Sequence, residues 1–277
     1  MSDLAPLREK IDTVDTELIR LLNERATIAQ EIGAIKNREG LPIYSPERED
    51  RVIRSLIERS KGPLTPEAIR AIYCEIMSAA LAIEKNVAIA CLGPAGSASH
   101  QAARSKFGSS VRYLFFADAA EVFQQVKKDE ADCGVVPIDD PEHGLINYTL
   151  DQLAETDLSI CAEIFLAQED SGSQDQARFF VVGRNANPPS TKDVTMLMLR
   201  IEDKPGALVS ALEPFKSLSI NLSHFASRPA SKGSQDIFFF VEAAGHLRDL
   251  QMVDLFRELS RCCRAVKVLG SYPKISS

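Results

Sequence analysis

Apolar side chains recur every three or four residues along the first part of the chain. This spacing places them on one face of an α-helix from about residue 4 to residue 36, about 50 Å long at 1.5 Å per residue. Because a compact domain cannot cover a helix of that length by itself, we expect a second copy of the chain to do so and predict a homodimer. The apolar positions are Leu4, Leu7, Ile11, Val14, Leu18, Leu21, Ile28, Ile32 and Ile35.

Two more helices are predicted before residue 86. Gly40 and Pro42 end the first helix. Ser45-Pro46-Glu47 and Thr65-Pro66-Glu67 each combine an N-cap residue, a proline in the first turn and an early acid, which is typical of a helix start. Residues 1–85 are therefore expected to form an all-helical unit.

From residue 86 the pattern changes to short apolar strands that alternate with helical stretches, which is typical of a parallel α/β sheet. We expect one α/β lobe over residues 86–183. After a linker at 185–190, the pattern of residues 191–277 reads strand, helix, strand, strand, helix, strand, the order of a ferredoxin-like sandwich. The predicted fold is thus multidomain. Its predicted strands lie at 87–92, 111–115, 133–138, 158–166, 177–183, 195–201, 220–227, 236–242 and 265–269.

Composition and charge exclude several classes of protein. The chain has 277 residues, 45% of them hydrophobic and 26% charged, which is typical of a globular protein. No apolar run approaches the ~18 residues of a membrane span, and no basic cluster suits a nucleic-acid partner. The charged first residues lack the apolar core of a signal peptide. The six cysteines form no Cys-x-x-Cys pair, so we expect reduced thiols, a cytoplasmic location and no metal or other cofactor.

Cations interrupt the apolar face of the first helix. Arg25 stands where an apolar residue is expected between Leu21 and Ile28. Lys36 follows 11 residues later, only about 20° from three full turns, so the two cations share a face about 16 Å apart and can hold a small dianion between them. Arg8 lies about 25 Å from Arg25 and can reach that ligand only from the partner of an antiparallel dimer. The alternative is that these cations are solvated or set the helix register.

Four stretches of this first unit belong together: Leu7-Arg8-Glu9-Lys10-Ile11-Asp12, Arg25 with Lys36, Tyr44-Ser45-Pro46-Glu47-Arg48-Glu49, and Ala80-Leu81-Ala82-Ile83-Glu84. As a set they resemble the all-helical chorismate mutases, which form an intertwined dimer and rearrange chorismate to prephenate without a covalent intermediate.

The resemblance implies an isomerase with six catalytic residues. Arg25 and Arg8 of the partner subunit would hold the carboxylates of chorismate. Lys36 would bind at the ether oxygen and a nearby carboxylate, Arg48 would steady the site, and Glu49 would accept the ring hydroxyl. Such contacts compress the substrate and stabilise charge on the breaking ether bond.

Glu84 occupies the position where members of that family carry Gln or Glu at the ether oxygen. A carboxylate cannot donate a hydrogen bond, so Glu84 must be protonated to act there. We therefore expect burial to raise the pKa of Glu84 and the activity to fall as the pH rises through that pKa. The alternative for Glu84 is a solvated acid near the end of a helix.

The middle unit contains three notable stretches: Leu92-Gly93-Pro94 with Gly96, Ser99 and His100, then Ala131–Ile138, then Gly144 with Thr149-Leu150-Asp151. Together they resemble prephenate dehydratase, which converts prephenate to phenylpyruvate, but the unit departs from that family. The dehydratase region of the family is much longer, and the polar run 168–176 stands where a second lobe is inserted. The catalytic threonine of the Thr-Arg-Phe motif is Ala177, which has no hydroxyl. We expect dehydratase activity to be absent or vestigial. Two further motifs depart from the family pattern: Gly96-Ser97-Ala98-Ser99 replaces its Gly-Thr-Phe-Ser, and Asp139-Asp140-Pro141 replaces its Glu-Asn-Ser.

The last unit contains Gly206-Ala207-Leu208-Val209, Asn221, Ala226-Ser227-Arg228-Pro229 and the ending Val268-Leu269-Gly270-Ser271-Tyr272-Pro273. This set resembles an ACT domain of the kind that senses phenylalanine. The resemblance implies L-phenylalanine as an allosteric effector and pairing of two copies through their sheets. The usual Glu of its Glu-Ser-Arg-Pro motif is Ala226, which departs from the effector-binding pattern. Helix capping alone is the alternative explanation of the glycine-containing stretch. The implied effector-binding residues are Gly206, Ala207, Leu208, Val209, Asn221, Ser227 and Arg228.

Three hypotheses follow from these units, which together have the layout of the bifunctional chorismate mutase/prephenate dehydratase family. The first is a chorismate mutase of aromatic amino acid biosynthesis that has lost its dehydratase activity and responds to phenylalanine. The second is a bifunctional mutase and dehydratase that forms phenylpyruvate. The third is a non-catalytic regulator that senses an amino acid. The complete set of mutase residues favours the first hypothesis over the third, and Ala177 favours it over the second.

Overall fold

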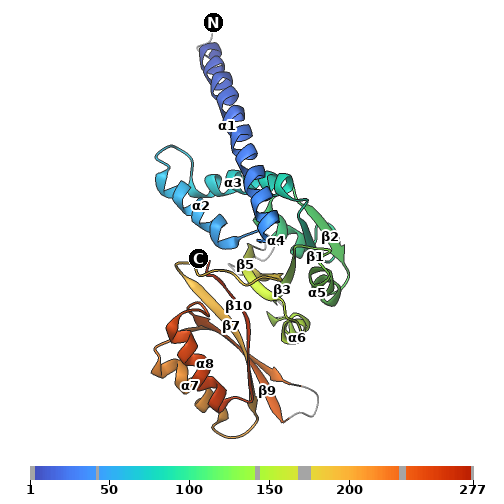
Figure 1. The fold of residues 1–277 in the computed structure, drawn as a ribbon, viewed down its shortest axis with the longest axis vertical. Coiled ribbons are helices and arrows are strands. Elements are labelled where there is room, and N and C mark those ends of the chain that lie inside the picture. The colour runs from blue at the N-terminus through green and yellow to red at the C-terminus, as the bar shows by residue number, and fades with distance from the viewer. Residues whose placement is uncertain (1–3, 42–43, 141–143, 168–175, 231–234, 276–277) are drawn as a thin grey trace.

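The structure is a computed structural model that describes residues 4–41, 44–140, 144–167, 176–230 and 235–275. Three helices lead into a six-stranded sheet, and a four-stranded sheet with two helices follows at the C-terminal end (Figure 1). Among the described residues, none of the helices has the combination of length and hydrophobicity that a transmembrane span requires.

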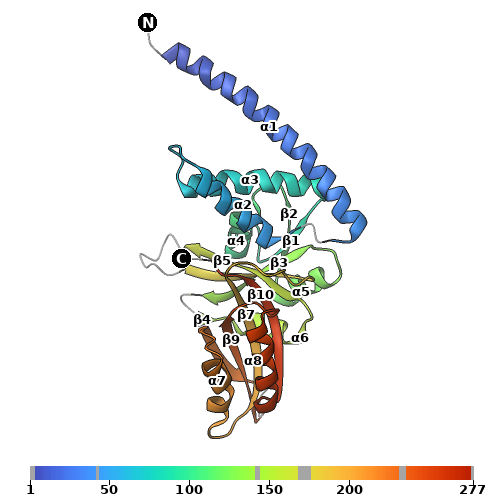
Figure 2. The same cartoon turned by 60° about the vertical axis from the view of Figure 1, so that its left-hand side comes forward.

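The first helix, α1 (Leu4–Glu39), projects far beyond the other two helices of this unit, and the third helix packs against the C-terminal half of α1 (Figure 2). The apolar seam along α1 is uncovered in the single chain, with Leu7 52% and Val14 65% exposed. The other two are α2 (Pro46–Arg59) and α3 (Pro66–Glu84), and both begin at the predicted capping residues. Thr65 accepts a hydrogen bond from the backbone N–H of Ala68, as an N-cap does. The predicted helical unit is confirmed; Pro42 lies outside the described residues.

The α/β lobe contains a mixed sheet with the strand order β2-β1-β3-β6-β5, and the short strand β4 pairs with the C-terminal end of β3. The prediction of a parallel sheet holds for β1, which is parallel to both β2 and β3, and is wrong for β6, which is antiparallel to both β3 and β5. β6 follows β5 without a described crossover helix, which a parallel pair would need. The elements of the lobe are β1 (Ala88–Leu92), α4 (Ala98–Phe107), β2 (Arg112–Phe116), α5 (Ala119–Lys127), β3 (Cys133–Asp140), β4 (Gly144–Leu145), α6 (Asn147–Glu155), β5 (Ser159–Ala167) and β6 (Gln176–Gly183).

The C-terminal part is an antiparallel sheet with the strand order β10-β7-β9-β8. The apolar residues of α7 and α8 pack on one face of this sheet, around Phe239 and Val241. The other face packs against the α/β lobe, so that Phe240 and Tyr272 share a core with Phe180 of the lobe. The elements are β7 (Asp193–Glu202), α7 (Ala207–Ser217), β8 (Leu222–Pro229), β9 (Asp236–Ala244), α8 (Leu250–Cys262) and β10 (Ala265–Pro273).

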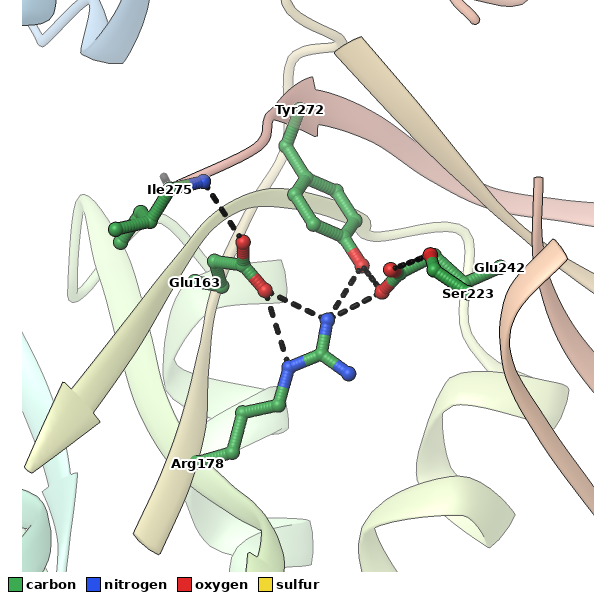
Figure 3. A network of polar contacts seen from close by, with 6 residues as sticks. All are labelled: Glu163, Arg178, Ser223, Glu242, Tyr272 and Ile275. Carbon is green, nitrogen blue, oxygen red and sulfur yellow. Dashed lines mark hydrogen bonds and ion pairs between the residues drawn. The ribbon is translucent and has the colours of Figure 1, made fainter. Parts of the chain in front are cut away.

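A buried polar network joins the two sheets around one guanidinium group (Figure 3). Arg178 Nη2 on β6 lies 2.6 Å from Glu163 Oε2 on β5 and also pairs with Glu242 on β9. The hydroxyl of Tyr272 on β10 donates to Glu242 at 2.9 Å. The side chains of Glu163 and Glu242 are 3% and 4% exposed, so protein groups, including the cation of Arg178, must supply the interactions that water would otherwise make.

Candidate active site

A cavity of about 330 Å³ lies where α1, α2 and α3 meet the C-terminal end of α4. Its volume suits a small organic molecule. The apolar part of its lining includes Ile28, Ile32, Val52, Met77, Leu81 and Phe107. Its charged lining residues are Arg25, Lys36, Arg48, Glu49, Glu84 and Lys106.

Helix α1 contributes Arg25 and Lys36 to this cavity, as the helical spacing predicts. Both side chains lie near the close crossing of α1 and α3. The buried residue Gly33 makes this crossing possible, because a Cβ atom there would lie 2.9 Å from the Cβ of Glu84. A larger residue at this position would separate the helix that carries the cations from the helix that carries the carboxyl group.

The last residue of α3 places a carboxyl group beside one of these cations. Glu84 Oε2 lies 3.6 Å from Lys36 Nζ and has no hydrogen-bond partner among the described residues. Burial raises the pKa of Glu84 above the usual value, and the nearby charges of Lys36 and Arg25 offset this only in part. This is the direction that the sequence predicts for a carboxyl group that must carry a proton.

The start of α2 brings Arg48 and Glu49 to the same cavity, with Arg48 at its solvent-exposed side. Glu49 Oε2 lies 3.4 Å from Lys106 Nζ on α4. The ring of Tyr44, just before α2, packs on Phe107 with 4.8 Å between the ring centroids. No sequence pattern marks Lys106 or Phe107 as a site residue, because only the packing of α4 against the helical unit brings them there. Tyr44 belongs to a stretch that resembles chorismate mutase, but that resemblance assigned it no role.

Arg8 is the predicted catalytic residue that the single chain does not bring to the cavity. It lies on the exposed, projecting end of α1, 17 residues or about 25 Å from Arg25 along the helix. No intramolecular movement of a side chain spans that distance. A contribution from Arg8 therefore requires a second subunit.

The charges around the cavity suit a small dianion. The described lining contains four cationic side chains and two carboxyl groups, one of which has a raised pKa. Cations that converge on a partly apolar cavity bind carboxylates with charge-assisted hydrogen bonds.

Three residues of the dehydratase-like stretches lie in well-defined surroundings within the lobe. Ser97 accepts from the backbone N–H of His100 as the N-cap of α4 and donates to the Leu92 carbonyl at 2.9 Å. Ala177 is buried in the core of the lobe, and Arg178 is neutralised by its two carboxylate partners. Pro141 and nearly all of the predicted polar run 168–176 lie outside the described residues.

The predicted effector residues lie on two faces of the C-terminal sheet. Gly206, with a φ of +81°, caps α7, whose first turn contains Ala207, Leu208 and the exposed Val209. Arg228 lies on the opposite face, where it pairs with Asp151 of α6 and stacks over Phe238 and Phe240. Ser227 faces away from Arg228 because neighbouring residues of a strand alternate, and Asn221 directly precedes β8. The structure therefore does not gather all seven residues of this single chain into one pocket.

Known families match the first two units of the chain. A family described as "Chorismate mutase type II" matches residues 7–85, and one described as "Prephenate dehydratase" matches residues 89–169. The prephenate dehydratase from Streptococcus mutans superposes with a TM-score of 0.57 at 26% identity, over 67% of this chain and 97% of that one. The one from Arthrobacter aurescens, solved in complex with L-Phe, has a TM-score of 0.60 at 21% identity, over 68% of this chain and 90% of that one.

Full-length relatives combine both units. The bifunctional chorismate mutase/prephenate dehydratase of Aquifex aeolicus is 32% identical over 99% of this chain and 99% of the relative. That of Stutzerimonas stutzeri is 30% identical over 98% of both. The alignment to the Aquifex relative has 358 positions against the 277 residues of this chain, so the relative contains segments that this chain lacks.

The fold and the cavity define an enzyme that joins a helical mutase region to an α/β dehydratase-like lobe. The chain belongs to the family of bifunctional chorismate mutase/prephenate dehydratases. A recognisable dehydratase region is present, and the comparisons favour the bifunctional alternative over a mutase that has lost its second activity.

Proposed function

We propose that the chain converts chorismate to prephenate in the cavity between α1, α2 and α3. Chorismate is a small dianion with one carboxylate on its ring and one on its enolpyruvyl ether side chain. The cavity of about 330 Å³ is lined by three cations of the region matched to chorismate mutase and by Lys106 of α4. This charge arrangement is the observation that carries the proposal. Because the reaction is intramolecular, the site needs only to hold a compact conformer and to stabilise charge on the ether oxygen.

Each charged group has a role in this proposal. Arg25 and Arg48 neutralise substrate carboxylates, Lys36 approaches the ether oxygen, and Glu49 accepts the ring hydroxyl. Protonated Glu84 donates a hydrogen bond to the ether oxygen beside Lys36. The loss of chorismate absorbance with the purified chain tests the proposal, and an inactive, folded chain would leave the non-catalytic regulator as the alternative.

Replacing Glu84 by glutamine is expected to change the pH profile of this reaction. The wild-type rate should fall as the pH rises through the raised pKa of Glu84, because only the protonated form donates. An amide donates at every pH, so Glu84→Gln should remove that decline in kcat. Initial rates between pH 5 and pH 9 measure both profiles. Glu67→Gln, on the exposed start of α3, is the control that should keep the decline. A decline unchanged in Glu84→Gln would assign the titration to another group.

We also propose that two chains pair along the uncovered seam of α1 and that Arg8 of each chain enters the active site of the other. The expected result is complementation between Arg8→Ala and Arg25→Ala. Each homodimer would have strongly reduced activity, whereas a mixed dimer contains one site with both arginines. Co-expression of two differently tagged variants and isolation of the mixed species measures this. A mixed dimer no more active than its parents would exclude a contribution of Arg8 across subunits.

Prephenate dehydratase is the second candidate function, and the matched family region and the full-length relatives favour it. The buried Ala177 and the neutralised Arg178 are the features of this chain that oppose it. A coupled assay separates the two cases. A bifunctional enzyme consumes chorismate and releases phenylpyruvate, whereas a mutase alone accumulates prephenate.

We further propose that residues 191–277 form an ACT domain in a cytoplasmic enzyme and that L-phenylalanine is its effector. The element order of this part and its antiparallel sheet support the assignment. Since Arg228 is held by Asp151, an effector pocket at the start of α7 would be completed by a second copy of the domain. Chorismate turnover with and without L-phenylalanine tests this regulation.

A further inference from the structure

The wall of the mutase cavity is not made by the helical unit alone. Lys106 and Phe107, the last two residues of α4, also line it. These residues belong to the stretch matched to prephenate dehydratase, residues 89–169. The second unit therefore supplies one of the four cations around a cavity that otherwise belongs to the first unit.

Several contacts fix the end of α4 against α3. Phe107 is 2% exposed and packs on Tyr44. Gly108, with a φ of +68°, ends the helix so close to α3 that a Cβ atom there would lie 2.6 Å from the Cβ of Ser78. The thiol of Cys74 on α3 donates to the carbonyl of Lys106 at 3.6 Å. The backbone around Lys106 is thus held in place by contacts with Tyr44 and with α3.

The side chain of Lys106 is directed to one catalytic group. Its Nζ atom lies 3.4 Å from Glu49 Oε2, and the two side chains are only 22% and 12% exposed. A carboxylate at this position without a cation would repel a dianionic substrate and would be free to rotate. Lys106 removes the repulsion and restricts the carboxylate to one orientation.

We propose that Lys106 is a positioning residue of the mutase site, which orients and neutralises Glu49, so that the dehydratase-like lobe completes the mutase active site. This inference rests on the proposed chorismate mutase function. If Lys106 has this role, both units of the chain contribute residues to the mutase site, whether or not the second unit has an activity of its own.

The test compares chorismate kinetics of full-length variants. Lys106→Met should lower kcat/KM by roughly 10- to 100-fold, the size of effect expected from a displaced catalytic group. KM should rise through the lost cation, and kcat should fall through the misoriented Glu49. Lys106→Arg should restore most of the activity because a guanidinium can also pair with Glu49. Arg104→Met removes an exposed cation from the same helix and should leave the kinetics unchanged.

A double-mutant cycle separates positioning from general support of the fold. In a Glu49→Gln background, Lys106→Met should cost far less than in the wild type, because Lys106 acts through Glu49. Additive losses would overturn the inference, and so would a Lys106→Met enzyme within twofold of the wild type. Circular dichroism confirms that each variant folds. A folded wild type with no mutase activity would instead overturn the proposed function itself.

Discussion

Arg25→Ala is expected to lower kcat/KM for chorismate by roughly 10²- to 10³-fold, the usual cost of removing one preorganised charge that stabilises a transition state. Arg25 is half-buried on the cavity and shares the face of α1 with Lys36. Alanine leaves a substrate carboxylate without its partner in a partly apolar environment, where water replaces the guanidinium poorly. Chorismate consumption under steady-state conditions measures the loss.

Arg20→Ala is the matched control for this experiment. Arg20 lies on the same helix, is exposed, and pairs only with neighbouring glutamates of α1 in the described contacts. Such exposed pairs contribute little to stability, so the control should retain wild-type kinetics and a similar melting temperature. Equal activity of the two variants would show that Arg25 does not bind the substrate and would contradict the proposal that this cavity binds the dianion.

Arg178→Met is expected to lower the free energy of unfolding by about 3–5 kcal/mol, the cost of leaving a buried ion pair without one partner. The substitution leaves Glu163 and Glu242 in the core between the two sheets without a cation. In the wild type, burial alone would raise the pKa of Glu242, but Arg178, Ser223 and Tyr272 hold it below the usual value. Urea denaturation of the full chain, followed by circular dichroism, measures the change.

The pH dependence distinguishes lost charge compensation from lost packing. Without Arg178, the buried carboxylates have raised pKa values and are stable only when protonated. The deficit of Arg178→Met should therefore be largest at neutral pH and should shrink as the pH falls through those raised values. Arg112→Met, at an exposed strand position, should change the stability by no more than about 0.5 kcal/mol. A deficit of Arg178→Met that is independent of pH would contradict the electrostatic explanation.

The sequence was most informative where local periodicity decides the structure. The three- and four-residue spacing along α1 predicts both the single long helix and the shared face of Arg25 and Lys36, because helical geometry fixes these relations within one element. The capping residues Ser45 and Thr65 predict the starts of α2 and α3 for the same reason.

Features that depend on contacts between distant elements were not predictable in this way. The contact of Lys106 with Glu49 joins residues of two units. The antiparallel placement of β6 between β3 and β5 depends on strand pairing, which the alternation of strands and helices does not specify. The partners of Arg178 come from three further strands, so the motif resemblance identified the arginine but not the network around it.

The pairing of β5 with β6 has a consequence for engineering. Gln176, where β6 begins, lies directly opposite Ala167, where β5 ends. Both ends are held by the backbone ladder of the sheet, so a guest protein whose own termini lie close together would fit between them without pulling the strands apart. This junction is a rational place to graft a fluorescent reporter or a foreign binding module onto the chain.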